Sequence, residues 1–370
     1  MSMQVKYLEL PEEFKDESLW TSLKEQFDTC QFIMGPEVKK FESAFAELCQ
    51  TPYALGLNSG TDAIFFALKA LYVGSGDEVI TAPNSFVATA GAIVAAGAKP
   101  VFVDVGDDYN IDVDLIEGAI NKKTKAILPV HLTGNPADMF EIMRIAKKHN
   151  LFVIEDAAQA VMASINNRRV GSFGDVGCFS LHPLKNLNVC GDGGILTTKS
   201  PGLFEKIKLL RNHGLKNRDE IEFFGYNSRL DTLQAVVANH VMKNLPSITE
   251  KRIKNAAVYD SELKGLSDFV TLPPRKKNVT QVFHTYVIQV KKREALTKHL
   301  NENGVETKIH YPIPIHLQKP CKALGYRKGD FPVCEKQSER ILSLPVHQYL
   351  TPEHICYVAD LIKKFYGIKA

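Results

Sequence analysis

The sequence predicts an α/β protein in which helices cover a mostly parallel sheet and a smaller α+β lobe follows. Three observations lead to this prediction. Short apolar runs alternate with amphipathic segments from Tyr53 to Ser200, a rhythm typical of parallel sheets with crossover helices. Asp156 follows the apolar run 151–154, at the edge where open α/β sheets bind ligands. Lys185 lies in a loop between two further apolar runs.

Composition excludes several classes of protein. The chain has 370 residues, 45% of them hydrophobic, and a net charge of +3, which is globular and too weakly basic to indicate a nucleic-acid partner. Seven cysteines at scattered spacings predict reduced cytosolic thiols, with neither a disulfide framework nor a zinc site. The N-terminus does not resemble a secretory signal, and no apolar run is long enough to span a membrane. We therefore expect a cytoplasmic protein with no membrane partner.

The first elements predicted are helices over 11–29 and 36–49, which are too polar for the central core. The apolar run Tyr53–Leu57 then predicts a strand that turns into a helix at residues 58–61. Such a turn can cradle a phosphate, because free N–H groups and the helix dipole point outward there. The residues alone favour an ordinary helix cap, since Ser and Asn are the usual cap residues.

The next elements alternate regularly. Phe86 precedes a helix that is almost wholly small or apolar and is therefore expected to be buried, and core packing is the usual fate of such a phenylalanine. Gly74 and Gly76 precede a strand and lack a third glycine, so the dinucleotide-binding fingerprint is absent. The strands expected are 77–81, 99–105, 126–130 and 151–154, and the helices are 87–96, 112–120 and 138–149.

Lys185 is the candidate reactive group. Pro183 precedes it and Gly191 and Gly193 follow it, so the loop holds the amine in a restricted place. Most loop lysines are simply solvated. Here, however, Asp156 lies at a neighbouring strand end, and a lysine that forms a Schiff base and a carboxylate that faces a pyridinium nitrogen are the two groups that pyridoxal phosphate chemistry requires.

Beyond residue 200 the pattern predicts a second lobe. Pro246 is expected to separate helices at 231–243 and 248–266, which places a boundary near 245 and gives units 1–245 and 246–370. The histidines in the loop 310–318 lack a third ligand nearby, so no metal site is expected. The other elements expected are helices at 201–211, 294–303, 333–341 and 352–366 and strands at 285–290 and 307–310.

Five segments resemble those of a known family. They are NSGTDA, NSFVATA, EDAAQA, FSLHPLKNL and GYNSRLDTLQA, and they occur in the family's order. The resemblance is to the DegT/DnrJ/EryC1/StrS family, the pyridoxal phosphate-dependent nucleotide-sugar aminotransferases of the aspartate aminotransferase superfamily. It runs from about Gly35 to the C-terminus. It implies fold type I, with a seven-stranded, mostly parallel sheet and a small C-terminal domain.

The resemblance also implies roles for individual residues. Lys185 would anchor the cofactor and act as general base, and Asp156 would keep the pyridine nitrogen protonated. Gln159 would bind the phenolate oxygen and Phe86 would stack on the ring. The phosphate would be held by Gly60, Thr61 and Ser180 and by Asn227 of the other subunit. The sugar would lie near His182, Arg229, His310, Tyr311 and His316.

The implied reaction moves an amino group from an amino acid, by family habit glutamate, to a dTDP- or UDP-linked 3- or 4-keto hexose. The product would be an amino sugar for surface polysaccharide such as lipopolysaccharide. Some relatives with histidine at the lysine position are dehydratases, so Lys185 favours transamination. Two alternatives stay open: a free acidic keto sugar such as an octulosonate, or a regulator that binds the cofactor without turnover.

The family completes each active site across a two-fold axis, which implies a homodimer with shared sites. The sequence offers a physical motive in the helix expected at 231–243. Its residues Leu233, Val236, Val237 and Val241 recur at helical spacing and exceed what a surface helix needs.

Overall fold

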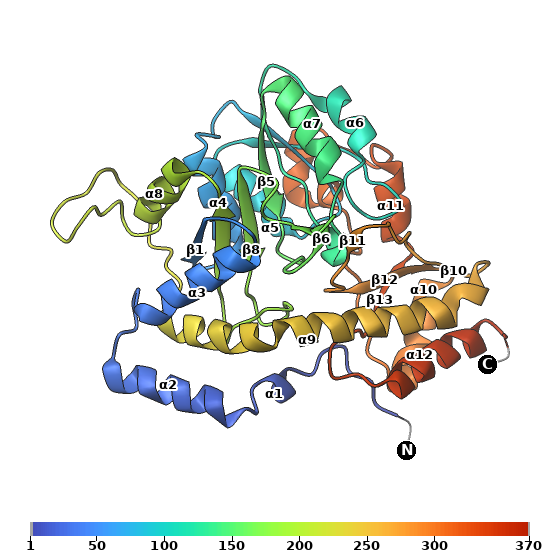
Figure 1. The fold of residues 1–370 in the computed structure, drawn as a ribbon. Coiled ribbons are helices and arrows are strands. Elements are labelled where there is room, and N and C mark those ends of the chain that lie inside the picture. The colour runs from blue at the N-terminus through green and yellow to red at the C-terminus, as the bar shows by residue number, and fades with distance from the viewer. Residues whose placement is uncertain (1–2, 369–370) are drawn as a thin grey trace.

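The computed structural model describes residues 3–368, and a seven-stranded sheet forms its centre (Figure 1). In spatial order the strands are β1 (Tyr53–Leu57), β9 (Gly194–Thr198), β8 (Val176–Ser180), β5 (Phe152–Asp156), β4 (Thr124–Ile127), β2 (Glu78–Thr81) and β3 (Lys99–Phe102). β9 pairs antiparallel with β1 and β8, whereas the other neighbours pair in parallel. The mostly parallel, seven-stranded prediction is confirmed.

Alternate side chains of each strand enter cores on opposite faces of this sheet, as a period of two requires. Leu55 and Ile154 pack with one set of helices, while their neighbours Ala54 and Val153 belong to clusters on the other face. The first set is α4 (Gly60–Ala70), α5 (Val87–Ala95) and α8 (Pro201–Leu210). The second face is covered by α3 (Pro36–Leu48), α6 (Val113–Ala119), α7 (Met139–His149) and the first part of α9 (Thr232–Leu263).

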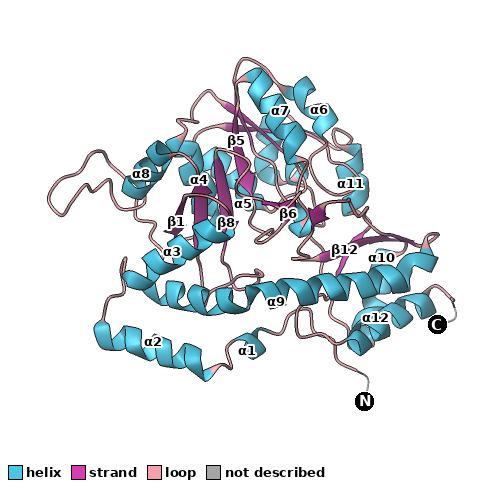
Figure 2. Cartoon of the chain, in the orientation of Figure 1, coloured by secondary structure: helices cyan, strands magenta, loops and turns pink. Residues whose placement is uncertain are grey.

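A smaller antiparallel sheet forms the C-terminal lobe (Figure 2). It contains β10 (Val270–Thr271), β12 (Tyr286–Val290) and β13 (Ile341–Leu344), packed with α10 (Arg293–Glu302), α12 (Pro352–Phe365) and the end of α9. A third sheet joins β11 (Val279–Thr280) to β6 (Ser164–Ile165) and β7 (Arg168–Arg169). The other elements are α1 (Leu10–Glu13), α2 (Glu17–Thr29), α11 (Pro332–Ser338), η1 (Leu132–Gly134), η2 (Lys264–Leu266), η3 (Ile315–Leu317) and η4 (Lys319–Leu324). Among residues 3–368, no helix has the length and apolar character needed to cross a bilayer.

The N-terminal helices differ from the prediction in two ways. The helix expected over 11–29 is split into α1 and α2, because the Asp16 side chain accepts from the N–H of Ser18 and starts a new helix. The expectation that these helices are too polar for the core is wrong for α3. Phe41 and Phe45 on that helix are fully buried.

The break expected at Pro246 is wrong, because α9 runs through this residue. A proline inside a helix removes a hydrogen bond and costs about 3 kcal/mol. Packing on both sides of Pro246 offsets that cost, since Leu245 and Ile248 are buried and α9 contacts both α3 and α12. The division of the chain into units 1–245 and 246–370 stays a prediction.

Two further expectations near the small lobe need correction. Residues 307–310 form only an isolated bridge, between Lys308 and Ser343, and no strand. The helix expected over 333–341 ends at Ser338, and the apolar run after it is strand β13, whose partner β12 is too distant in sequence to be visible in a local pattern. On α5, Val87 and Val94 are more than half exposed, so that helix is less buried than predicted.

Candidate active site

A cavity of about 370 Å³ opens at the carboxyl ends of β5 and β8. This is the edge at which open α/β sheets bind ligands, and the volume lies in the range of small-molecule sites. Most of the residues predicted for the site line this cavity: Gly60, Thr61, Phe86, Asp156, Gln159, Ser180, His182, Lys185, His310 and Tyr311.

Asp156 forms the floor of the cavity, as the last residue of β5. Its Oδ2 accepts a hydrogen bond of 2.7 Å from Thr89 Oγ1, and its Oδ1 accepts one of 3.2 Å from the Ala158 N–H. Burial raises the pKa of this carboxyl, while the Thr89 hydrogen bond, the Ala158 hydrogen bond and the nearby Lys185 lower it. The floor therefore carries an oriented carboxylate that can pair with a cationic group in the cavity.

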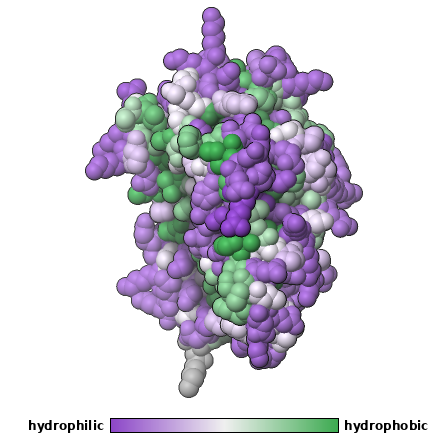
Figure 3. All heavy atoms as spheres, turned by 90° about the vertical axis from the view of Figure 1, so that its left-hand side faces the viewer, coloured by the Kyte–Doolittle hydropathy of each residue, from purple (hydrophilic) through white to green (hydrophobic). Residues whose placement is uncertain are grey.

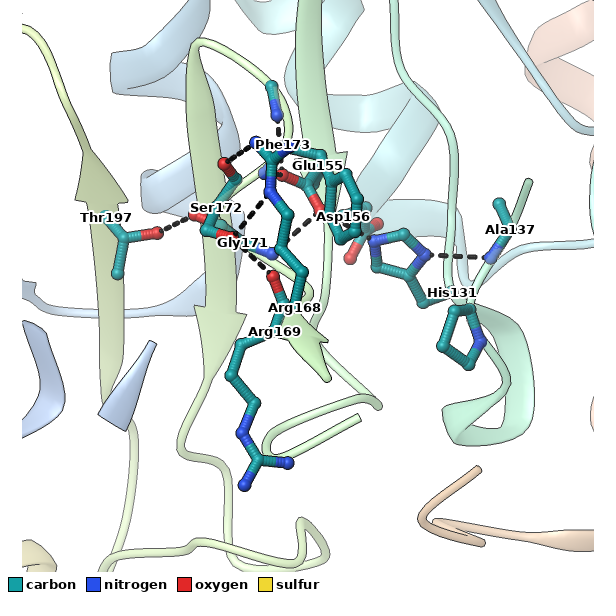
Figure 4. A network of polar contacts seen from close by, with 12 residues as sticks. His131, Ala137, Glu155, Asp156, Arg168, Arg169, Gly171, Ser172, Phe173 and Thr197 are labelled. Atoms are coloured by element: carbon teal, nitrogen blue, oxygen red, sulfur yellow. Dashed lines mark hydrogen bonds and ion pairs between the residues drawn. The ribbon is translucent and has the colours of Figure 1, made fainter. Parts of the chain in front are cut away.

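Behind the floor, Glu155 is fully buried and satisfied by four donors (Figure 4). Its oxygens accept from the backbone N–H groups of Gly171, Phe173 and Gly174, each at 2.7 Å, and from His131 Nε2 at 3.1 Å. His131 Nδ1 accepts from the Ala137 N–H, so the ring proton is on Nε2 and faces the carboxylate. This network ties the end of β5 to the turns beside it and leaves Asp156 little freedom.

Gln159 is also held in one orientation. Its Oε1 accepts a 2.7 Å hydrogen bond from the Thr133 N–H. The Thr133 hydroxyl accepts in turn from Gln281 Nε2, and Thr133 has a positive φ of 61°, a strained conformation for a β-branched residue. Because the amide oxygen is occupied, the Gln159 side chain is left to offer its NH₂ group to a ligand oxygen.

Lys185 enters the cavity from a loop that two buried amides fix. Asn186 Nδ2 donates to the Val282 carbonyl, and Asn188 Nδ2 donates to the Pro183 carbonyl and to Glu13. Burial lowers the pKa of Lys185 to about 8, with Asp156 opposing the shift. About a tenth of this amine is therefore uncharged at pH 7, far more than for an ordinary lysine, and the uncharged state is the one that acts as a nucleophile or base.

The N-terminus of α4 forms a close-packed cradle at the side of the cavity. Ser59 caps the helix by accepting from the Asp62 N–H, while the N–H groups of Gly60 and Thr61 have no acceptor within the helix. A Cβ on Gly60 would lie 2.7 Å from Ser180 Cβ, so only glycine lets the helix approach this serine. The N–H groups of Gly60 and Thr61 and the Ser180 hydroxyl thus lie together at this side of the cavity, an arrangement that suits a phosphate.

The wall on the small-lobe side is aromatic and polar. Phe86, 53% exposed, lies at the cavity mouth with its ring centroid 5.8 Å from that of Tyr311. Burial, with Lys185 as the next cause, lowers the pKa values of His182 and His284 and brings that of His310 to about 4. Uncharged imidazoles near the lysine offer both donors and acceptors to a hydroxylated ligand.

Three predicted residues lie outside the cavity of this chain. His316 is buried and pairs with Glu335 at 3.0 Å. Arg229 donates to Asn212 Oδ1. Asn227 is exposed, whereas its neighbour Ser228 is buried and donates to Asp62 on α4. Since adjacent side chains of an extended segment point in opposite directions, Asn227 faces away from its own α4.

Several residues of the site were not predicted from the sequence. Ser85 and Thr89 hold Asp156, Thr133 holds Gln159, and Tyr7, His284 and Thr285 line the cavity. The signal for Thr89 was within reach, because NSFVATA places Ser85 and Thr89 one helical turn apart at the start of α5. The other residues reach the site through contacts distant in sequence.

Comparison with known proteins gives consistent results. The family model of the DegT/DnrJ/EryC1/StrS aminotransferase family matches residues 14–363. A pleiotropic regulatory protein of Geobacillus stearothermophilus is 43% identical, over 98% of this chain and 99% of its own. The UDP-N-acetyl-3-dehydro-alpha-D-glucosamine 3-aminotransferase of Acidithiobacillus ferrooxidans is also 43% identical, over 95% and 94%.

Solved structures agree over nearly the full length. DesV of S. venezuelae, in complex with a ketimine intermediate, superposes with a TM-score of 0.95 at 37% identity and 98% coverage of both chains. NtdA of Bacillus subtilis, with bound cofactor PMP, gives 0.89 at 33% identity, covering 97% of this chain and 85% of its own. PMP is the amine form of pyridoxal phosphate.

Proposed function

The chain belongs to the DegT/DnrJ/EryC1/StrS aminotransferase family and uses pyridoxal phosphate, and we propose that its amino acceptor is the keto group of a nucleotide-linked hexose. The observation that carries the proposal is one cavity that joins Lys185 and Asp156 to a wall of hydrogen-bonding side chains. The named substrate of the Acidithiobacillus relative, a UDP-linked 3-keto sugar, supports the acceptor class.

The residues present fit the cofactor. Gly60, Thr61 and Ser180 line the cavity where the first N–H groups of α4 are free to donate to a phosphate, and Asp156 offers a carboxylate on the floor. We assign the phosphate to Gly60, Thr61 and Ser180 and the ring nitrogen to Asp156. The remaining assignments are the phenolate oxygen to the Gln159 amide, the ring face to Phe86 and the covalent anchor to Lys185.

Within this assignment the chain positions groups and moves one proton. The bound cofactor supplies an electron-withdrawing ring that stabilises negative charge on the carbon bearing the amino group. Lys185 Nζ, with its pKa lowered to about 8, would be the base that takes a proton from this carbon and delivers it to the carbon on the other side of the nitrogen, the 1,3-proton shift that transamination requires. His182, His310 and Tyr311 bind sugar hydroxyls at the mouth, and the closed floor excludes water from the ring nitrogen.

We further propose glutamate as the donor, a homodimer with shared sites, and a cytoplasmic location. Arg229 belongs to the same arm as Asn227, and we place both at the partner's site. The outward direction of Asn227 supports this assembly. The apolar residues expected to drive it do not, because Val236, Val237 and Val241 are buried within their own chain. All seven cysteines are free, which supports a reducing compartment.

The test is a panel of acceptors. The protein loaded with pyridoxal phosphate is incubated with glutamate and UDP- and dTDP-linked 3- and 4-keto hexoses, or with a free octulosonate, and aminated products are sought by mass spectrometry. Amination of a nucleotide-linked hexose is expected. Amination of the octulosonate alone would replace the proposed acceptor. No product from any of them would favour a cofactor-binding regulator, the class suggested by the name of the Geobacillus relative.

A further inference from the structure

Two hydroxyls at the start of α5 form a chain that ends on the floor carboxylate. Ser85 Oγ lies 2.7 Å from Thr89 Oγ1, and Thr89 Oγ1 lies 2.7 Å from Asp156 Oδ2. Ser85 is 4% exposed, Thr89 1% and Asp156 5%. At these distances and this burial both contacts are hydrogen bonds in a water-poor environment, where they are stronger than in solvent.

The direction of this chain follows from the number of protons. An ionised carboxylate only accepts, and a hydroxyl has a single proton to donate. Thr89 therefore donates to Asp156, and its own oxygen accepts from Ser85. Both hydroxyl dipoles point their positive ends toward the carboxylate, which favours its charged form.

Helix capping does not explain these hydroxyls. Serine and threonine at a helix start usually accept from a backbone N–H of the first turn, as Ser59 does on α4. In α5 the N-cap position is occupied by Phe86, and no side chain caps the helix. Ser85 precedes the cap and Thr89 lies within the first turn, and their hydroxyls form the chain to the carboxylate.

Other groups near Asp156 come from several elements. Lys185 and His131 lower the pKa of this carboxyl, and burial raises it more than they lower it. Tyr311 and Cys178 also lie near it, and burial raises the pKa of each, with the Asp156 carboxylate as the next cause. Thr89 differs from these groups because it is the hydroxyl bonded directly to the carboxylate, and it leads the influences that oppose burial.

We propose that Thr89 is a positioning residue that holds Asp156 Oδ2 oriented and ionised toward the ring nitrogen of the cofactor, with Ser85 fixing the Thr89 hydroxyl. The interaction acts through Asp156 and requires the cofactor but no sugar. The proposal rests on the cofactor assignment and is independent of the proposed acceptor, so either can fail alone.

The test compares two cofactors on apo-protein, with affinity measured by absorbance titration. One is pyridoxal phosphate, and the other is its 1-deaza analogue, in which a C–H replaces the ring nitrogen. Thr89→Val keeps the shape but removes the hydroxyl, and Thr89→Ser, the matched control, retains it. Since a hydrogen bond to a charged group is worth about 1.5–3 kcal/mol, we expect Thr89→Val to weaken pyridoxal phosphate binding about tenfold or more and to leave the analogue unchanged.

Further readouts separate positioning from general packing. Thr89→Ser should bind both cofactors like the wild type, and Ser85→Ala should weaken pyridoxal phosphate alone, by a smaller factor. The loss in Thr89→Val should grow as pH falls, because removal of the hydrogen bond raises the pKa of Asp156 further. If Thr89→Val does not fold, Thr89→Ala replaces it. Equal losses for both cofactors, or no loss for either, would overturn the proposal.

Discussion

The floor of the cavity and the arm formed by residues 212–229 differ in how completely one chain satisfies them. On the floor, Glu155 has four N–H donors and Asp156 has two donors, all within the chain. On the arm, which projects between α8 and α9 (Figure 1), Phe224 is 92% exposed and Asn227 faces outward. The hydrogen bonds of the floor are made within one chain, whereas Phe224 and Asn227 of the arm are exposed in the described part of the chain, residues 3–368.

The surface around the arm supports this contrast. Figure 3 views the molecule from the side on which the arm projects, and apolar patches there alternate with polar side chains. Exposed apolar residues of the arm and of α2 with its following loop include Ile221, Phe224, Tyr226, Phe27, Ile33 and Met34. These exposed apolar side chains are the ones that a partner subunit would cover in the proposed dimer. The difference is the one expected of the proposed homodimer, in which one chain holds the groups around the cofactor and the arm reaches the other subunit.

Loss of the Lys185 amine should have the largest effect on turnover. Lys185→Ala removes the amine that we propose as both covalent anchor and general base, and a positioned base alone contributes roughly 10²- to 10⁴-fold. We expect turnover to fall about a thousandfold or more and borohydride to leave no cofactor bound to the chain. Lys206→Ala is the matched control, since Lys206 is another half-buried lysine but lies outside the cavity. Persistent borohydride-stable attachment in Lys185→Ala would remove this lysine from the mechanism.

The floor carboxylate should rank second. Asp156→Asn keeps the shape but loses the charge proposed to pair with the ring nitrogen, a loss of about 1.5–3 kcal/mol for a charged hydrogen bond. We expect turnover to fall roughly 10- to 100-fold while the cofactor still binds. Asp175→Asn serves as the control, because Asp175 accepts from the Val153 N–H outside the cavity. If Asp156→Asn and Asp175→Asn have the same turnover, Asp156 does not have the proposed role toward the ring nitrogen.

The pH dependence of Lys185 labelling should be an effect of intermediate size. Its pKa lies near 8 and below the ordinary 10.5, so the uncharged fraction rises about tenfold per pH unit up to about 8 and then levels off. In apo-protein, labelling of Lys185 by an amine reagent should follow this curve, while exposed lysines should keep gaining reactivity to about 10.5. Mass spectrometry of labelled peptides from pH 6 to 10 measures both. A Lys185 midpoint near 10.5 would contradict a desolvated site.

The same floor shows what a sequence can predict. Asp156 and Lys185 could be predicted from the sequence because each follows a strong apolar run, and strand ends of a parallel sheet meet at one edge. Thr89 lies 67 residues from Asp156, and its role depends on a contact that no local pattern encodes. The prediction at Pro246 was wrong for a related reason. A local rule predicted a helix end there, but packing on both sides of the residue keeps α9 continuous.

The arm provides the smallest and most specific prediction. In a dimer with shared sites, each site combines Lys185 of one subunit with Asn227 of the other. A Lys185→Ala subunit paired with an Asn227→Asp subunit then places both lesions in one site and leaves the other intact. Each homodimer should have low activity, because the Lys185→Ala homodimer lacks the amine and the Asn227→Asp homodimer repels the cofactor phosphate. A mixed dimer, purified by two different tags, should regain about half of the wild-type activity per dimer.

Action within one chain predicts the opposite result. If Asn227 served the phosphate of its own subunit, each site of the mixed dimer would carry one lesion, and activity would stay at the level of the weak homodimers. The Ser228 side chain points inward and donates to Asp62 on α4, which argues against that arrangement. The Asn227 side chain would have to point to the same side of the segment as its neighbour. Mixed dimers without recovered activity, or an active monomer at high dilution, would show that the arm works within its own subunit.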